Sequence, residues 1–171
     1  ASGISTHKFL KKRADVYLFD DNQKIKQQIK IKKLEKTKFD KIIISPGIDL
    51  SNCKLSYFLS KNFSKIHTDL DVFYEFFKND CITITGTNGK STTCQLLYKV
   101  LKNQKLDVRL VGNIGKPILS VKNVKKKTIF VIEASSYQLD YSKNFSSKYA
   151  AILNISPDHI ERHKTFKKYI N

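Results

Sequence analysis

A short run of glycine, lysine and hydroxyl residues in this sequence has the composition of a phosphate-binding loop. Residues 86–92 read Gly-Thr-Asn-Gly-Lys-Ser-Thr and follow a run rich in β-branched residues. Gly86 and Gly89 can adopt backbone angles that turn successive N–H groups towards an anion. Lys90 adds a positive charge for the β and γ phosphates, and the Ser91 hydroxyl can ligate Mg2+. The remaining members of the predicted loop are Thr87, Asn88 and Thr92.

The loop departs at one position from the general pattern G-x-x-x-x-G-K-[ST], because Ile84 stands where the first glycine would be. The alternative interpretation is an ordinary strand-to-helix turn that carries an incidental lysine. A strand is expected before the loop and a helix after it, and the positive N-terminus of that helix would face the same phosphates. This context favours the phosphate-binding interpretation.

Glu133 is a second candidate site residue, because it ends the apolar run 129–133. A carboxylate at the end of a strand beside the loop can hold Mg2+, since hard cations take oxygen ligands. The alternative is a solvated glutamate that caps the next turn. The unusual string that follows, Ala-Ser-Ser-Tyr-Gln-Leu over 134–139, favours the functional interpretation.

His159 is a third candidate, placed just beyond an expected strand and before a helix N-terminus. It can ligate a second metal ion or contact a phosphoryl group, although an isolated histidine is more often structural. His163 lies one helical turn further on the same face. The spacing would suit two metal ligands, but we expect His163 at the helix surface.

The elements that must position these residues alternate between strand and helix, which predicts an α/β fold with a parallel sheet. Strands are expected over 14–19, 40–45 and 64–66 in a first unit, and over 81–85, 107–111, 128–133 and 149–154 in a second. Helices are expected over 3–12, 69–78, 92–102 and 165–171. Each strand of the second unit ends in polar residues, so four loops should form one nucleotide-facing rim.

Two segments of the first unit should lie at the corresponding edge. Asp20 and Asp21 follow the first expected strand, and open α/β sheets bind ligands at such strand ends. Ser45-Pro46-Gly47 follows the next strand and predicts a rigid turn with exposed N–H groups.

Composition excludes several classes of protein. The hydrophobic content of 40% suits a globular chain, and no apolar run is long enough for a membrane span. The three cysteines have no metal-ligand spacing and suit a reducing cytoplasm. The chain contains no methionine and ends within an expected helix, so we expect a fragment of a longer protein.

The net charge of +17 raises the possibility of nucleic-acid binding. However, 29 of the 32 basic residues are lysines spread along the chain, whereas arginine makes most specific phosphate and base contacts. The densest basic runs do not interleave aromatic residues as a base-stacking surface would. We therefore expect solvated faces and no nucleic-acid partner, and keep a basic P-loop nucleic-acid-binding module as the alternative.

Four strings in this order resemble the Mur ligases: Thr-Gly-Thr-Asn-Gly-Lys-Ser-Thr, Val-Gly-Asn-Ile-Gly, Glu-Ala-Ser-Ser-Tyr-Gln-Leu and Asn-Ile-Ser-Pro-Asp-His-Ile-Glu-Arg-His. Within that family they are most similar to the member that adds D-glutamate during peptidoglycan synthesis. The resemblance implies an ATP- and Mg2+-dependent amide ligase that joins D-glutamate to UDP-N-acetylmuramoyl-L-alanine through an acyl phosphate. Another amide ligase of the superfamily, similar to folylpolyglutamate synthase, is the alternative.

The resemblance also implies a domain organisation. Residues 1–67 would form a Rossmann-like domain that binds the uridine nucleotide, and residues 68–171 would form part of the ATP-binding central domain. D-glutamate and the family's carbamylated lysine would belong to parts of the protein beyond Asn171.

The resemblance assigns roles to individual residues. Catalytic roles fall on Lys90, Asn113 and His159. ATP phosphates would be bound by Gly86, Thr87, Asn88, Gly89, Lys90, Ser91 and Thr92, and Mg2+ by Ser91, Glu133 and His159. The UDP-linked substrate would contact Ser5, Asp21, Asn22, Ser45, Gly47, Asn113 and Ser135. Asp21-Asn22 stands where many relatives carry Thr-Arg, and Glu161 replaces a usual aspartate.

Overall fold

The structure is a computed structural model that describes residues 2–21, 25, 28–158 and 160–170, without the side chain of Glu161. It is a mixed α/β structure with two parallel sheets. The α/β fold predicted from the sequence is therefore confirmed. None of the helices in the described part of the chain is long and apolar enough to span a membrane.

The larger sheet has four strands in the order β4-β5-β3-β6, and every neighbouring pair is parallel. Its strands are β3 (Cys81–Thr85), β4 (Val108–Gly112), β5 (Ile129–Glu133) and β6 (Tyr149–Ile152). Because all four run the same way, their carboxyl ends meet at one edge, as expected. There Glu133 pairs in register with Ile84 on one side and Gly112 on the other.

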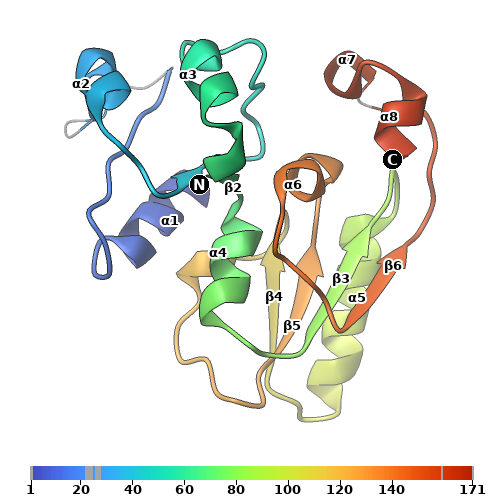
Figure 1. Cartoon of the computed structure of the whole chain (residues 1–171). Coiled ribbons are helices and arrows are strands. Elements are labelled where there is room, and N and C mark those ends of the chain that lie inside the picture. The colour runs from blue at the N-terminus through green and yellow to red at the C-terminus, as the bar shows by residue number, and fades with distance from the viewer. Residues whose placement is uncertain (1, 22–24, 26–27, 159, 171) are drawn as a thin grey trace.

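Helices cover both faces of this sheet, which explains why its central strand β5 is continuously apolar up to Glu133. On one face, α5 (Lys90–Asn103) packs through Cys94 against Ile84 and Val131. On the other, α4 (Asp69–Phe76) packs through Phe73, whose ring meets Phe130 edge-on at 4.8 Å between centroids. Figure 1 shows α4 and α6 (Ser136–Tyr141) in front of the sheet and α5 behind it.

The smaller sheet pairs β1 (Ile42–Ile43) with β2 (Ile66–His67) in parallel, and its core is formed by Ile44, Leu59 and Ile66. Around it lie α1 (Ser2–Leu10), α2 (Ile31–Lys36), α3 (Ser56–Lys61) and a 3-10 turn at Phe63–Lys65. The sequence patterns missed α2 and α3, which are short and bury one residue each.

The strand predicted over 14–19 is wrong. In the described residues this stretch forms only an isolated bridge between Leu18 and Gln28. Strand-forming side chains make a strand only when neighbours pack against them. Here Ala14, Asp15 and Tyr17 are exposed, so neither face of the stretch is buried.

Two short helices follow β6. These are α7 (Ile160–His163) and α8 (Phe166–Ile170), and α8 corresponds to the helix predicted over 165–171. In Figure 1 both lie on the side of the molecule where the carboxyl ends of the larger sheet meet.

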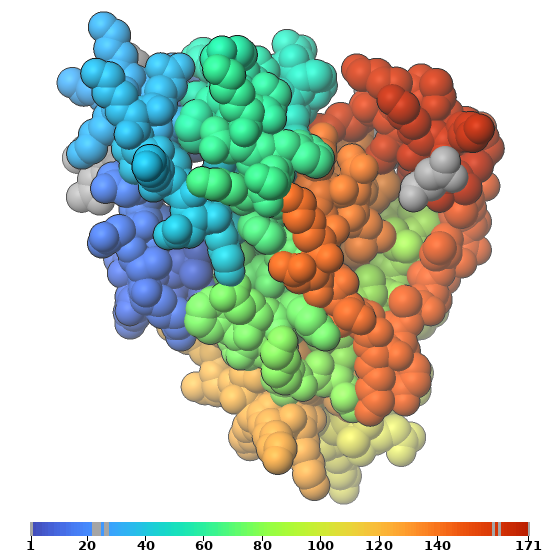
Figure 2. Space-filling model, viewed as in Figure 1, coloured from blue at the N-terminus to red at the C-terminus, as the bar shows by residue number. Residues whose placement is uncertain are grey.

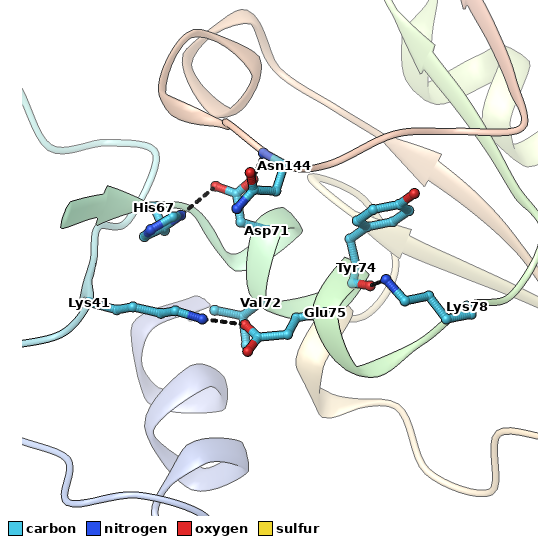
Figure 3. Close-up of a pocket in the computed structure, with 8 residues that line it drawn as sticks. All are labelled: Lys41, His67, Asp71, Val72, Tyr74, Glu75, Lys78 and Asn144. Atoms are coloured by element: carbon cyan, nitrogen blue, oxygen red, sulfur yellow. Dashed lines mark hydrogen bonds and ion pairs between the residues drawn. The ribbon is translucent and has the colours of Figure 1, made fainter. Parts of the chain in front are cut away.

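The buried carboxylate of Asp71 joins the start of α4 to the loop after α6 (Figure 3). It accepts the N–H group of Thr68 at 2.9 Å within a capping box. From the loop it accepts hydrogen bonds from the Ser142 hydroxyl and from the N–H groups of Lys143, Asn144 and Phe145. His67 lies 3.7 Å away, and burial lowers the pKa of its ring below the usual range.

A cavity of about 360 Å3 opens beside Asp71 and contains none of the site residues predicted from the sequence. Its lining residues are Lys41, His67, Asp71, Val72, Tyr74, Glu75, Lys78 and Asn144. Most of its charged groups have partners within the cavity wall, including the Lys41–Glu75 ion pair at 2.6 Å. We therefore interpret this cavity as part of the structural contact between the start of α4 and the loop after α6.

Asp71 should make stability depend on pH. Burial opposes its ionisation, but hydrogen bonds from Thr68, Asn144, Ser142 and Lys143 together hold its pKa below the usual value. A carboxyl of this kind stabilises the fold above its unfolded-state pKa of about 4, and the stabilisation is lost as pH falls through the folded-state pKa. We expect Asp71→Asn to lower the free energy of unfolding at pH 7 by about 1–3 kcal/mol, and by less below a pH of about 4.

Asp69 supplies the control for urea unfolding measured across this pH range. It is equally buried, but burial raises its pKa, with a hydrogen bond from Gln138 acting in the opposite direction. The cost of Asp69→Asn should therefore be smaller at pH 7 than in acid, the opposite trend. A cost of Asp71→Asn that did not vary with pH would contradict the role given to its carboxylate.

Candidate functional site

The loop between β3 and α5 has the backbone that the glycines predicted. Gly86 has φ of 134° and Gly89 has φ of 83°, values that residues with a Cβ rarely adopt. A Cβ on Gly86 would also lie 3.0 Å from the carbonyl oxygen of Asn154. Gly89 precedes the first residue of α5, where N–H groups lack acceptors within the helix. The loop therefore offers an anion a helix N-terminus together with a glycine-shaped turn.

Lys90 is folded back over this loop. Its Nζ donates to the carbonyl oxygens of Gly86 at 2.6 Å and Thr87 at 2.7 Å. The ammonium is thus held within the turn itself, at the positive end of α5. The Lys90 charge therefore lies at the loop, where it can exchange these hydrogen bonds for contacts with a bound phosphate.

Asn154, just after β6, holds the loop in place. Its side-chain Oδ1 accepts the N–H of Asn88 at 2.8 Å, and its Nδ2 donates to the carbonyl oxygen of Asn88 at 2.9 Å. Its own carbonyl oxygen accepts the N–H of Thr87 at 3.0 Å. Sequence reasoning did not single out Asn154. The only available signal was its place in the string Asn-Ile-Ser-Pro-Asp-His.

Removing this side chain should loosen the loop. We expect Asn154→Ala to weaken binding of the ATP predicted from the sequence by about thirtyfold, since two hydrogen bonds that fix the Asn88 peptide are lost and each contributes about 1 kcal/mol. Isothermal titration calorimetry measures the affinity directly. Asn79→Ala is the matched control, because the Asn79 amide holds the carbonyls of Lys125 and Thr128 in a different loop. Equal effects of both variants on ATP affinity would contradict the local role of Asn154.

Glu133 ends β5 as a carboxylate with 3% exposure. Its Oε2 has no hydrogen-bond partner among the described residues. A buried carboxylate oxygen without a donor is costly, so the position is suited to a cation. Burial, and secondly the carboxylate of Glu133, raise the pKa of the nearby Cys94 thiol to about 11.

The surroundings of Glu133 fit Mg2+ better than a metal held by protein groups alone. No three His, Cys, Asp or Glu side chains gather closely enough to hold a metal within the described ranges. Mg2+ does not need such a cluster, because it commonly keeps waters and binds through one or two carboxylates plus substrate phosphates. Ser91, on the exposed first turn of α5, is the hydroxyl that the sequence predicted as a second ligand.

Asn113 lies at the same edge as Glu133. Its N–H donates to the carbonyl oxygen of Glu133 at 2.9 Å. The preceding Gly112 has φ of 103°, and a Cβ there would collide with that same carbonyl oxygen. Glycine thus lets β4 and β5 approach closely, and the exposed side chain of Asn113 stands at the rim.

Ser135 caps the N-terminus of α6. Its hydroxyl accepts the N–H of Gln138 at 3.3 Å, and the Gln138 side chain accepts the N–H of Ser135 at 3.2 Å. The Nε2 of Gln138 donates a hydrogen bond to the Oδ1 of the buried Asp69 at 3.2 Å. The hydroxyl of Ser135 therefore already has a structural use.

The expectation that His163 lies at the helix surface is wrong. His163 is buried, and its Nε2 is 3.0 Å from the hydroxyl of Ser136. Its ring stacks on Tyr137 at 5.4 Å and lies 5.1 Å from Tyr169 of α8. Because α7 is only four residues long, α8 returns over it and covers the histidine. His159 lies outside the described residues.

The residues predicted for the nucleotide substrate fall into two groups. Ser45 begins a turn closed by the N–H of Ile48 at 3.0 Å, and the hydroxyl of Ser2 lies 3.5 Å from that of Ser45. Ser5 is on the same helix, where its hydroxyl donates to the carbonyl oxygen of Ser2. The start of α1 thus meets the turn that contains Gly47.

Asp21 belongs to a separate group. It accepts the N–H of Lys54 at 2.9 Å and lines a cavity of about 710 Å3. The other lining residues are Phe19, Asp20, Ile25, Gln28, Ile29, Lys30, Ile31, Lys32 and Lys54. The Oε1 of Gln28 is buried without a hydrogen-bond partner among the described residues. Asn22 lies outside the described residues.

Known proteins are similar to this sequence. A family model described as the Mur ligase middle domain matches residues 84–171. The chain is 37% identical to a UDP-N-acetylmuramoylalanine--D-glutamate ligase of Rickettsia bellii (strain RML369-C), over 99% of this chain and 39% of that protein. Proteins of the same name from Rickettsia felis (strain ATCC VR-1525 / URRWXCal2) and Caldicellulosiruptor bescii (strain ATCC BAA-1888 / DSM 6725 / KCTC 15123 / Z-1320) are 40% and 35% identical, over 99% and 98% of this chain and 39% and 40% of their own lengths. The chain thus spans about two fifths of the length of the curated relatives it matches.

Proposed function

Because the chain belongs to the Mur ligase family, we propose that it forms the ATP-phosphate and acceptor sites of an ATP-dependent amide ligase. The reaction joins D-glutamate to UDP-N-acetylmuramoyl-L-alanine through an acyl phosphate, as the names of the relatives support. The observation that carries this proposal is the single edge at which the phosphate loop, Glu133 and Asn113 meet.

In this proposal the loop binds the phosphates of ATP. The N–H groups at the start of α5 donate hydrogen bonds to the phosphate oxygens. The residues of this loop are Gly86, Thr87, Asn88, Gly89, Lys90, Ser91 and Thr92. Lys90 exchanges its hydrogen bonds with the carbonyls of Gly86 and Thr87 for contacts to the transferred phosphate. Its charge then offsets the negative charge that develops during transfer.

Ser91, Glu133 and His159 are the proposed Mg2+ ligands. When bound, Mg2+ supplies positive charge to the phosphate oxygens. The unpartnered Oε2 of Glu133 supports this assignment, because a cation there would relieve the cost of burying the carboxylate.

We assign the acceptor substrate to residues that lie around both sheets. The proposed contacts are Ser5, Asp21, Asn22, Ser45, Gly47, Asn113 and Ser135. In this proposal residues 1–67 carry the uridine nucleotide and residues 68–171 carry ATP, while Asn113 orients the muramoyl part at the rim. None of the proposed site residues is assigned to D-glutamate. The free Cys53, Cys81 and Cys94 suit a cytoplasmic location.

Phosphate release by the full-length protein tests the proposal. Release should require UDP-N-acetylmuramoyl-L-alanine, ATP, Mg2+ and D-glutamate together, and should stop when any of them is omitted or when L-glutamate replaces D-glutamate. Release that depended on a folate substrate instead would favour the alternative ligase. Release without any acceptor would overturn the proposal.

The high positive charge calls for a second measurement. All three arginines already make contacts within the chain: Arg13 with Phe9, Arg109 with Asp107, and Arg162 with the carbonyls of Pro46 and Ile48. Any binding of oligonucleotides should therefore come from lysines, be independent of sequence, and fall steeply with salt. Tight oligonucleotide binding at physiological salt, with no binding of the UDP-linked substrate, would favour the nucleic-acid-binding alternative.

A further inference from the structure

Arg162 of α7 joins two parts of the molecule that are distant in sequence. Its guanidinium carbon lies 4.8 Å from the centroid of the Tyr137 ring and 5.7 Å from that of Tyr141, both in α6. Its Nη2 donates to the carbonyl oxygen of Ile48 and lies 3.5 Å from that of Pro46. In Figure 2 the red C-terminal segment borders the teal segment that follows this turn.

The 3.5 Å contact between Arg162 and the Pro46 carbonyl shows which way the Pro46–Gly47 peptide is turned. The carbonyl of Pro46 and the N–H of Gly47 belong to one planar peptide, and in the trans form they point in opposite directions. No peptide bond in the described residues is cis. With the carbonyl turned to Arg162, the N–H of Gly47 is turned away from it. A Cβ on Gly47 would meet nothing within 4 Å, so open space lies beside this residue.

We propose that Arg162 is a positioning residue for the acceptor substrate, and this inference rests on the proposed function. It holds the turn so that the N–H of Gly47 faces the anionic diphosphate of the substrate. Arginine suits this role because its flat guanidinium stacks on aromatic rings while its N–H groups donate in the same plane. A lysine at this position would keep the charge and one donor but lose the stacked plane.

Steady-state kinetics of the full-length enzyme test the inference. Arg162→Met should raise the KM for UDP-N-acetylmuramoyl-L-alanine about tenfold, the effect of losing one charge-assisted hydrogen bond, and leave the KM for ATP within about twofold. Arg162→Lys should fall between Arg162→Met and the wild type. Asn154→Ala should show the reverse pattern, with ATP affected and the acceptor spared.

Arg13→Met is the matched control. Arg13 also stacks on two rings, those of Phe9 and Phe76, and donates to the carbonyl oxygen of Phe9 at 2.7 Å. It lies away from the turn, so Arg13→Met should leave both KM values unchanged. An effect of Arg162→Met that Arg13→Met reproduced would show a general loss of stability and overturn the inference.

Two failures are distinguishable. If the wild-type enzyme does not bind the UDP-linked substrate, the proposed function fails and this inference fails with it. If the wild type binds that substrate and both Arg162 variants, folded by circular dichroism, bind it equally well, only the positioning role of Arg162 is wrong. A parallel rise in both KM values would also contradict it.

Discussion

Replacing Lys90 with alanine is expected to lower the rate of ligation a hundredfold or more while the fold remains intact. The charge lost is the one that Gly86 and Thr87 hold inside the phosphate loop. Removing one positioned charge or donor at a developing anion commonly costs about a hundredfold to a thousandfold in rate. The fold should survive because the lost hydrogen bonds lie in a partly exposed turn, whereas the core lies elsewhere.

The measurement is phosphate release at saturating ATP and UDP-N-acetylmuramoyl-L-alanine, with circular dichroism to establish folding. Lys99→Ala is the matched control, because Lys99 is an exposed lysine of the same helix beyond its first turn. It should retain wild-type turnover. A folded Lys90→Ala enzyme with near-normal turnover would rule out the assignment of the loop to ATP.

Replacing Glu133 with glutamine is expected to change activity and stability in opposite directions. The Mg2+ concentration for half-maximal activity should rise about tenfold or more, because an amide is a poorer Mg2+ ligand than a carboxylate. In the absence of Mg2+, the variant should be more stable than the wild type by about 1 kcal/mol or more, since a buried charge with an unpartnered oxygen is removed.

A purely structural glutamate would not give this pair of results. Glu75→Gln is the control, because Glu75 is half exposed and pairs with Lys41 at the surface. That substitution should leave the Mg2+ requirement unchanged and alter stability only slightly. If Mg2+ titrations of Glu133→Gln overlay those of the wild type, then Glu133 is not a metal ligand.

The sequence predicted those features of the site that depend on local chemistry. Gly86 and Gly89 indicated positive φ angles directly, because glycine is favoured where other residues are strained. The apolar run before Glu133 likewise predicted a buried strand that ends at the carboxylate. Strand direction followed from the alternation of helices and strands.

Features that depend on distant partners were not predictable in the same way. Asn154 meets Asn88 across 66 positions, and Arg162 meets Pro46 across 116. Nothing in the residues near Asn154 or Arg162 identifies those partners, so only the folded chain shows them. The burial of His163 was missed for the same reason, because Tyr169 covers it only after α8 turns back. The strand predicted over 14–19 failed for a different reason. These residues have strand-forming side chains, but within the described part of the chain no neighbouring strand packs against them.

The order of strands in the larger sheet also determines when the phosphate loop can form during synthesis. Cys81 of β3 pairs with Phe130, and Ile82 pairs with Tyr149, whereas β4 and β5 are close in the chain and pair with each other. Closing long loops costs more entropy than closing short ones, so we expect contacts between β4 and β5 to form earlier than those of β3. As the chain leaves the ribosome, β3 is therefore synthesised before β5 and β6, the two strands with which it pairs. The phosphate loop can take its place beside β5 and β6 only after residues 129–152 have been synthesised.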